Sequence, residues 1–228
     1  MDLRTRLADL DARISDAAEA AGRNPSEITR IIVTKFHPLE LIDDLVALGV
    51  RDVGENRQQE LTAKHDAYRG PDDLRWHFIG QLQTKKARAV RAAADAVHSV
   101  DRARVADALH AAAAPGDGVL DVFLQVNLTD DPARGGVAPA DLEELAAHVA
   151  GSCPSLRVRG VMGVAPLDEE PAAAFARLAG YGDVVRGVVP DARALSAGMT
   201  GDFAEAIAAG ATHLRIGSAI TGPRPVHG

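Results

Sequence analysis

The chain has 228 residues, a formal net charge of −7 and an apolar content of 46%, but only 4% of its residues are aromatic. This length is enough for one domain, and the scarcity of aromatic rings predicts a core of Ala, Val, Leu and Ile. The acidic charge excludes a broad cationic field, so we expect neither nucleic acid nor a membrane as a partner. Because Cys153 is the only cysteine, an intrachain disulfide and a cysteine-based zinc cluster are also excluded, and we expect no metal site.

The first 22 residues predict an amphipathic helix before the first strand. Leu3, Leu7, Leu10 and Ile14 recur at helical spacing, and Gly22 ends the pattern. Charges interrupt the apolar residues, so the segment lacks the continuous apolar stretch of a secretory signal or a membrane span. We therefore expect a cytoplasmic protein.

From residue 30 onward, short β-branched runs alternate with longer segments rich in Ala, Leu and charged residues, which is typical of repeated βα units. Eight strands are predicted, at Arg30–Thr34, Arg51–Val53, Leu74–Ile79, Ala96–Ser99, Leu120–Asn127, Leu156–Val161, Ala194–Ser196 and His213–Ile216. Eight sequential units favour a closed (β/α)8 TIM barrel over an open sheet. No linker-like stretch divides the chain, so we expect residues 1–228 to form a single α/β domain.

Lys35 directly follows the first predicted strand, at the end where barrels of this type gather their functional groups. A lysine that ends an apolar strand can be desolvated enough to lower its pKa, as an imine-forming amine requires. A lysine that only reaches solvent there is the structural alternative.

The seventh and eighth predicted strands are followed by loops of small residues, 196–201 and 215–218. Glycines let backbone N–H groups approach an anion, hydroxyls add donors, and a helix starting near Thr200 or Gly201 would point its positive end inward. Phosphate is commonly bound at this place in such barrels. A reactive lysine opposite a phosphate site fits pyridoxal 5′-phosphate (PLP), and it equally fits a sugar phosphate in an aldolase.

A series of motifs along the chain favours PLP over a sugar phosphate. They are Val33-Thr34-Lys35, Gly54-Glu55-Asn56, Trp76-His77-Phe78-Ile79-Gly80-Gln81-Leu82-Gln83, Gln125-Val126-Asn127, Arg159-Gly160-Val161-Met162, Leu195–Asp202 and Arg215-Ile216-Gly217. Occurring in one order from the first helix almost to the last residue, they resemble the PLP homeostasis proteins, also called the alanine racemase N-terminal-domain-like proteins.

The resemblance implies a PLP cofactor held as a Schiff base on Lys35. It places Asn56 and His77 near the ring and assigns Arg215 to the cofactor, facing either the ring nitrogen or the phosphate. The residues that it places around the phosphate are Ser196, Met199, Thr200, Gly217 and Ser218.

Two positions depart from the family pattern. Arg57 stands where the family often has an aromatic residue, and Lys85 stands where it often has Asn. Lys85 begins a positive cluster with Lys86, Arg88 and Arg91, which we expect at or near the mouth of the pocket, either as a solvated helix face or as a docking face for an acidic partner.

Two enzymatic alternatives share parts of this pattern. A PLP-dependent amino-acid racemase of related fold needs a second acid–base group, supplied in those enzymes by a tyrosine of another domain, and this chain ends where that domain would begin. Tyr68 and Tyr181 fall in helix-like segments, which leaves His77 as the remaining candidate base. A serine hydrolase built on Ser196 is disfavoured because the motif lacks its first glycine and little chain follows it.

The resemblance implies a carrier or buffer of PLP in vitamin B6 homeostasis, without efficient turnover. The partners that follow from this are PLP itself and apo-enzymes that use it, and we expect a monomer.

Overall fold

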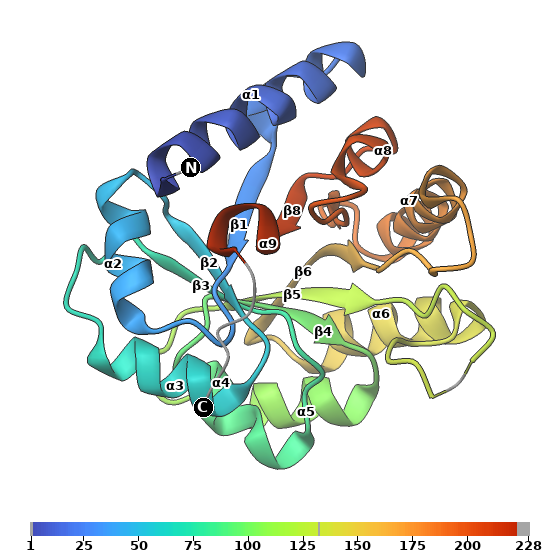
Figure 1. Ribbon diagram of the computed structural model, residues 1–228. Helices are drawn as coiled ribbons and strands as arrows, with labels where there is room; N and C mark the ends of the chain where they lie inside the picture. Colours follow the sequence, from blue (N-terminus) through green and yellow to red (C-terminus); the bar gives the residue numbers. More distant parts are fainter. Residues whose placement is uncertain (1, 132, 223–228) are drawn as a thin grey trace.

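Eight parallel strands close into a barrel, in the order β1 to β8, in the computed structural model, which describes residues 2–131 and 133–222 (Figure 1). The strands are β1 (Thr29–Val33), β2 (Asp52–Glu55), β3 (Arg75–Phe78), β4 (Ala96–Val100), β5 (Leu120–Gln125), β6 (Leu156–Met162), β7 (Ala194–Ser196) and β8 (His213–Ile216). All eight predicted strands are confirmed, and so is the predicted TIM barrel.

Helices surround the barrel on the outside (Figure 1). They are α1 (Leu3–Ala20), α2 (Leu39–Ala47), α3 (Gln58–Ala67), α4 (Ala87–Arg91), α5 (Ala103–Ala111), α6 (Leu142–Ser152), α7 (Pro171–Val188), α8 (Phe203–Ala208) and α9 (Ser218–Thr221), with 3-10 turns at Pro25–Glu27, Thr84–Lys86 and Pro139–Asp141. Each helix after α1 follows a strand, which gives the right-handed βα repeat expected of parallel strands.

The predicted N-terminal helix is confirmed as α1, and the buried face carries the predicted residues Leu7, Leu10 and Ile14. The helix packs against α8 and α9. Because α9 has only four residues, it covers little of the barrel wall, and α1 covers the part that a full-length last helix would occupy. The helix that precedes the barrel in sequence therefore completes the outer layer.

The layer between strands and helices is mainly aliphatic, as predicted from the scarcity of aromatic residues. The interior of the barrel is different. The Phe123 ring of β5 lies 5.0 Å from the His213 ring of β8, and the His98 ring of β4 stacks on Phe123 at 4.2 Å. Contacts between strands that are not neighbours cross the lumen, so the barrel encloses aromatic and polar side chains.

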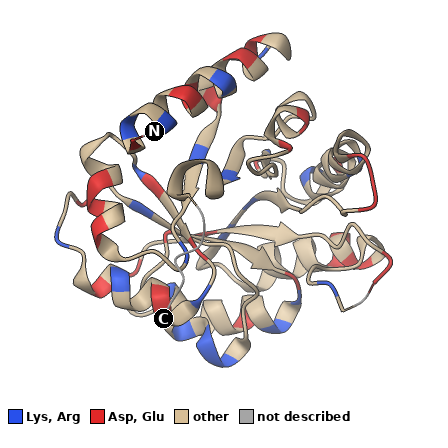
Figure 2. Cartoon of the chain, in the orientation of Figure 1, with Lys and Arg blue, Asp and Glu red and all other residues tan. Residues whose placement is uncertain are grey.

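Acidic and basic residues are interspersed along the outer helices, as along α1 (Figure 2). Over the part of the chain that the structure describes, no helix combines the length and the apolar character needed to cross a bilayer.

Candidate functional site

The carboxyl ends of four consecutive strands carry most of the predicted site. Strand β1 pairs with β2 on one side and with β8 on the other, and β8 pairs with β7. Lys35 and Asn56 therefore follow neighbouring strands, and the loops after β7 and β8 follow the next two. The closure of the barrel brings the last two strands of the chain beside the first two.

Lys35 itself is exposed, and its amine has no hydrogen-bond or ion-pair partner among the described residues. The sequence predicted an amine desolvated by its place at the end of a strand. The structure does not bury this amine. It leaves the amine accessible, so that a ligand could cover it.

The backbone after Lys35 is held in an uncommon conformation. Phe36 has a φ of 68°, in the left-handed region that a bulky residue rarely adopts. Its N–H donates to the Glu60 carboxylate of α3 at 2.7 Å, and the guanidinium of Arg57 lies 4.8 Å from the centre of its ring. Arg57, a departure from the family pattern, thus packs on the residue that follows the predicted Schiff-base lysine.

A buried ion pair fixes the end of β1 on its other side. Lys64 of α3 donates from Nζ to Oε1 of Glu55 at 2.6 Å and to the Thr34 carbonyl at 2.9 Å, and the Thr34 hydroxyl donates to the same carboxylate oxygen at 2.7 Å. Burial raises the pKa of Glu55, while the charge of Lys64 and these hydrogen bonds oppose that rise. The residue immediately before Lys35 is therefore held through both its backbone and its side chain.

The loop after β7 depends on a glycine. Gly198 has a φ of +90°, and a Cβ atom there would lie 2.7 Å from the Ala206 Cβ. Met199 and Thr200 follow, and the Met199 N–H donates to Asp202 at 2.6 Å. Helix α8 begins at Phe203, slightly later than the predicted start near Thr200 or Gly201.

The loop after β8 is shorter. Gly217 is the N-cap of α9, and Ser218 is its first residue. Neither α8 nor α9 has a side-chain cap hydrogen bond, so their first N–H groups are not occupied in that way.

Arg215 and Ser196 lie inside the barrel beneath these loops. Arg215 is 5% exposed and Ser196 is completely buried. The guanidinium donates from Nη1 to Ser196 Oγ at 2.7 Å and from Nη2 to the Gly163 carbonyl at 2.8 Å. Burial lowers the pKa of Arg215 to about 10, which leaves it a cation at neutral pH.

His77 also lies inside the barrel, where its Nε2 atom is 2.8 Å from Asp52 and its Nδ1 atom is 2.9 Å from His98. Its side chain is completely buried. The structure thus separates His77 from the exposed strand ends, although the resemblance predicts it near the ring.

Asn56 offers an observation that fits a bound polar ligand. Its side-chain oxygen is buried and has no hydrogen-bond partner among the described residues. The backbone there is closely packed, since a Cβ atom on Gly80 would lie 2.0 Å from the Asn56 carbonyl oxygen. A buried acceptor without a partner costs free energy, which a donor on a ligand would recover.

The predicted basic cluster does not form one surface at the mouth. Arg91 is 7% exposed, and its guanidinium donates to the carbonyls of Leu109, Ser155 and Gly118. The expectation that it lies near the mouth is wrong, because its long cationic side chain, at the end of a short helix, donates to carbonyl groups of adjacent segments.

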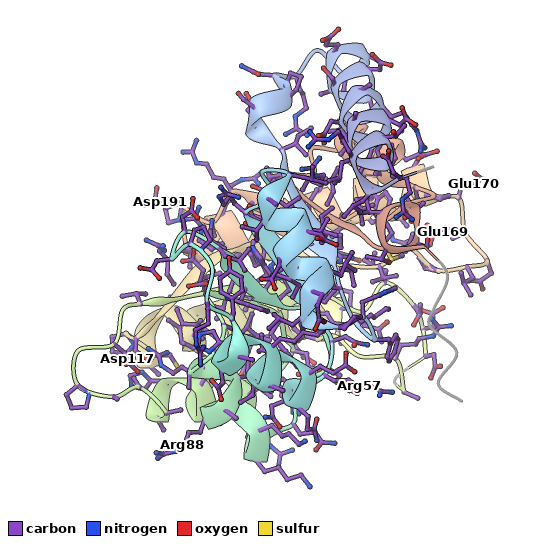
Figure 3. The ribbon with its side chains drawn as sticks, turned by 60° about the vertical axis from the view of Figure 1, so that its left-hand side comes forward. Arg57, Arg88, Asp117, Glu169, Glu170 and Asp191 are labelled. Atoms are coloured by element: carbon purple, nitrogen blue, oxygen red, sulfur yellow. The ribbon has the colours of Figure 1, made fainter. Side chains whose placement is uncertain are left out.

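The other members of the basic cluster also separate. Lys86 lines a cavity of about 190 Å³ together with Asn56 and Gln81, whereas Arg88 lines a different cavity with Asp117. In Figure 3, Arg88 also lies well apart from Arg57, which packs on the ring of Phe36 next to Lys35.

Ser196 has a histidine neighbour that the sequence did not indicate. His98 Nδ1 lies 2.8 Å from Ser196 Oγ, which resembles a nucleophile and its base. However, the same hydroxyl accepts from Arg215 and has no exposed surface. A substrate carbonyl cannot approach it without rearrangement, so the arrangement gives no support to a hydrolase.

The sequence also missed Glu60, Lys64 and His98. Glu60 and Lys64 are four residues apart on one helix, where charged residues ordinarily face solvent. His98 did carry a signal, because it and Ser99 are polar residues inside the otherwise apolar run that forms β4.

Three metal-ligating side chains meet on the outside of the barrel, between α5 and α6. His148 Nε2 and Cys153 Sγ both contact Oδ1 of Asp107, at 2.7 Å and 3.7 Å. Burial and the neighbouring carboxylate raise the pKa of Cys153 to about 11, and the hydrogen bonds satisfy the three groups mutually.

Comparisons with known proteins agree with this geometry. The family model described as alanine racemase, N-terminal domain, matches residues 7–225. Among solved structures, PipY of Synechococcus elongatus with PLP bound has a TM-score of 0.84 and 32% identity, covering 97% of this chain and 100% of PipY. Alanine racemase from Corynebacterium glutamicum, with a TM-score of 0.67, 18% identity and coverage of 97% of this chain and 62% of its own, shows likeness of fold alone. Fold and site define a barrel of the alanine racemase N-terminal-domain class.

Curated relatives narrow the class further. The pyridoxal phosphate homeostasis protein of Escherichia coli K12 is 38% identical over 228 residues, covering 98% of this chain and 97% of its own. The protein of the same name from Mycobacterium tuberculosis H37Rv is 37% identical over 241 residues, covering 98% and 93%. The chain belongs to the pyridoxal phosphate homeostasis protein family.

Proposed function

We propose that this protein holds PLP as a Schiff base on Lys35 and contributes to PLP homeostasis as a carrier or buffer. One observation carries the proposal. An accessible amine without a partner follows β1, beside the glycine-containing loops after β7 and β8, in a chain 32% identical to PipY, whose structure is described with PLP bound.

PLP supplies an aldehyde that condenses reversibly with an amine, with loss of one water molecule. In the proposal, the chain's own residues prepare that exchange. The contacts of Glu60 and Arg57 with Phe36, which we call the clamp on Phe36, hold the backbone that carries Lys35. The side-chain oxygen of Asn56, which has no hydrogen-bond partner among the described residues, offers an acceptor to the ligand. Backbone and hydroxyl donors of the loops at Met199, Thr200, Gly217 and Ser218 would bind the phosphate.

Arg215 and Ser196 have a narrower role in this proposal than the sequence suggested. Ser196 is buried beneath the loops and touches the Arg215 guanidinium. We therefore assign Arg215 to the cofactor and let Ser196 act through it. His77, two hydrogen bonds further along, acts at a greater distance.

Carrier function without efficient turnover is supported by where the acid–base groups lie. Tyr181 belongs to α7, and Tyr68 is the C-cap of α3, where its ring packs edge-on against Trp76. Neither tyrosine stands at the carboxyl end of a strand. His77 is hydrogen-bonded at both ring nitrogens and completely buried, which makes it a poor second base for a racemase.

The proposed carrier is cytoplasmic and monomeric, consists of one domain, and passes PLP to apo-enzymes. Its relatives are named for homeostasis and not for a reaction, which is consistent with this proposal. No nucleic acid is needed as a partner.

Racemisation tests the proposal directly. We expect PLP-loaded protein, incubated with single enantiomers of alanine or serine in deuterated water, to show slow exchange of the imine without conversion of enantiomers. One positioned acid–base group contributes about a hundred- to ten-thousand-fold to rate, so loss of one face leaves at most a trace. Efficient racemisation that disappears in Lys35→Ala would establish the racemase instead.

A further inference from the structure

A continuous series of hydrogen bonds crosses the interior of the barrel. It runs from Asp52 Oδ1 to His77 Nε2 (2.8 Å), from His77 Nδ1 to His98 Nε2 (2.9 Å), from His98 Nδ1 to Ser196 Oγ (2.8 Å), and from Ser196 Oγ to Arg215 Nη1 (2.7 Å). We call this series the interior chain. Four of its members are at most 5% exposed, and Asp52 is partly exposed.

The two ends of the interior chain fix the direction of every hydrogen bond in it. A guanidinium can only donate, and an ionised carboxylate can only accept. Arg215 therefore donates to Ser196, whose own O–H donates to His98 Nδ1. His98 must then carry its proton on Nε2 and donate to His77, which likewise carries its proton on Nε2 and donates to Asp52.

Both imidazoles are neutral in this arrangement. Burial lowers the pKa of His98 well below its ordinary value, and the charge of the Arg215 guanidinium acts in the same direction. A second proton on His77 would turn its Nδ1 into a donor facing the donor of His98. Reversing His98 to accept it would leave the Ser196 hydroxyl without an acceptor among its contacts in the described part of the chain.

The interior chain joins opposite ends of the barrel. Asp52 is the first residue of β2, at the amino end of the strand, whereas the predicted cofactor residues follow the carboxyl ends. Arg215 has no carboxylate within ion-pair distance among the described residues, although it is a buried cation. Aligned hydrogen bonds polarise one another, so the carboxylate of Asp52 favours the cation through the series.

Packing holds the middle of the chain in place. The His98 ring stacks on Phe123 at 4.2 Å with an interplanar angle of 14°. His213 touches the same two rings but hydrogen-bonds to Thr212 and stands outside the interior chain. It is thus a matched control, because it is a third interior imidazole and has no place in the interior chain.

We propose that Asp52, His77 and His98 are positioning residues that act from inside the barrel to hold Ser196, and through it the Arg215 guanidinium, in the orientation that the cofactor meets. This inference rests on the proposed PLP site and deepens it. None of the three residues needs to touch the cofactor.

The first test concerns the interior chain itself and needs no cofactor. Nitrogen-15 NMR of the histidine rings at neutral pH is expected to show His77 and His98 as neutral Nε2–H tautomers. Asp52→Asn keeps an acceptor but removes the charge, and it should shift the resonances of both rings. An Nδ1–H tautomer or a charged ring at His98 would overturn the proposal.

The second test measures PLP bound to the full chain by titration and by its absorption spectrum. Replacing His98 by leucine removes both ring nitrogens and leaves Ser196 and Arg215 misplaced. We expect PLP affinity to fall about tenfold or more, since hydrogen bonds to charged groups have that value, and the absorption maximum to shift. His98→Gln, which can donate and accept, should recover much of the loss.

The control His213→Leu should bind PLP within about twofold of the unmodified protein, because a loss under 0.4 kcal/mol means that no charged hydrogen bond was lost. If His98→Leu does not fold, Asp52→Asn and His98→Gln carry the comparison. Wild-type affinity and spectrum in folded His98→Leu, or in both milder variants, would overturn the positioning role. Absence of any PLP adduct in the unmodified protein would instead refute the PLP site.

Discussion

The polar side chains at the mouth of the barrel and those in its interior differ in exposure and in hydrogen bonding. At the mouth, Lys35 is exposed and has no polar partner among residues 2–131 and 133–222, while Thr34 and Phe36 on either side of it are held by helix α3. In the interior, His98, Ser196 and Arg215 are buried, and each member of the interior chain is hydrogen-bonded to the next. A reactive amine must remain accessible, whereas side chains that fix an orientation must be hydrogen-bonded. In the barrel, the accessible amine lies at the mouth and the hydrogen-bonded side chains lie in the interior.

The buried ion pair between Glu55 and Lys64 gives the largest expected effect at the mouth. Glu55→Ala leaves the Lys64 cation buried at 8% exposure without its carboxylate. We expect the free energy of unfolding to fall by about 3–5 kcal/mol, as for other broken buried pairs. Chemical denaturation would measure the change.

A solvent-exposed pair provides the matched control. Asp73→Ala breaks the contact with Arg51, whose members have side chains 64% and 39% exposed. The expected loss is under about 1 kcal/mol. Equal losses for Glu55→Ala and Asp73→Ala would mean that the pair beside Lys35 does not anchor the end of β1.

The phosphate loops provide the next largest effect. If Met199, Thr200, Gly217 and Ser218 bind the phosphate, pyridoxal without phosphate should bind about a hundredfold more weakly than PLP, since charge-assisted hydrogen bonds are the strong ones. Titration under identical conditions compares the two. Comparable affinities would remove the role assigned to the loops after β7 and β8.

The interior predicts a dependence of stability on pH. Burial is the largest cause that lowers the pKa of His213 from 6.5 to about 3, and the charge of Arg75 acts in the same direction. The unfolded chain therefore gains a proton near pH 6.5 that the folded chain does not, so stability falls as the pH decreases between these values. From pH 6.5 to pH 5 this one group removes about 2 kcal/mol.

Denaturation at pH 7 and pH 5 checks this effect. His213→Asn should lose less stability on acidification than the unmodified protein, by about the same 2 kcal/mol. His98 acts in the same direction in both proteins, so the difference isolates His213. An identical decrease in the two proteins would show that the pKa of His213 is the same in the folded and unfolded chain.

The clamp on Phe36 should have the smallest effect. Glu60→Ala removes the acceptor of the Phe36 N–H, a single hydrogen bond worth about 1 kcal/mol, and we expect PLP affinity to fall about fivefold. Glu60→Gln keeps an acceptor oxygen and should lose less. Glu40→Ala, an exposed glutamate on α2, should change nothing, and an equal effect there would exclude a specific clamp.

The sequence predicted those features of the site that depend only on where the strands begin and end. Alternating runs located all eight strands, because parallel strands buried on both faces are almost continuously apolar. Lys35 and the two loops could be proposed because strand ends can be read from the pattern, whereas Asn56 was proposed from the family resemblance. The interior chain could not be found in this way, since Asp52, His98 and Ser196 come from strands far apart in sequence and meet only when the barrel closes.

The sequence also could not predict how exposed a side chain is or which residues it contacts. The exposure of Lys35 and the burial of Arg91 both depend on how far neighbouring helices reach, which residue types alone do not determine. Arg57 illustrates the same point, because its contact with the Phe36 ring requires the left-handed backbone of Phe36.

Borohydride reduction of the PLP-loaded protein, followed by peptide mapping, tests whether Lys35 carries PLP. Reduction converts an imine into a stable amine, so the account predicts one phosphopyridoxyl group per chain, on Lys35. Lys35→Ala should remain folded and take up no label. A label on Lys64, Lys85 or Lys86 in its place, or an unlabelled protein that still binds PLP, would contradict the account.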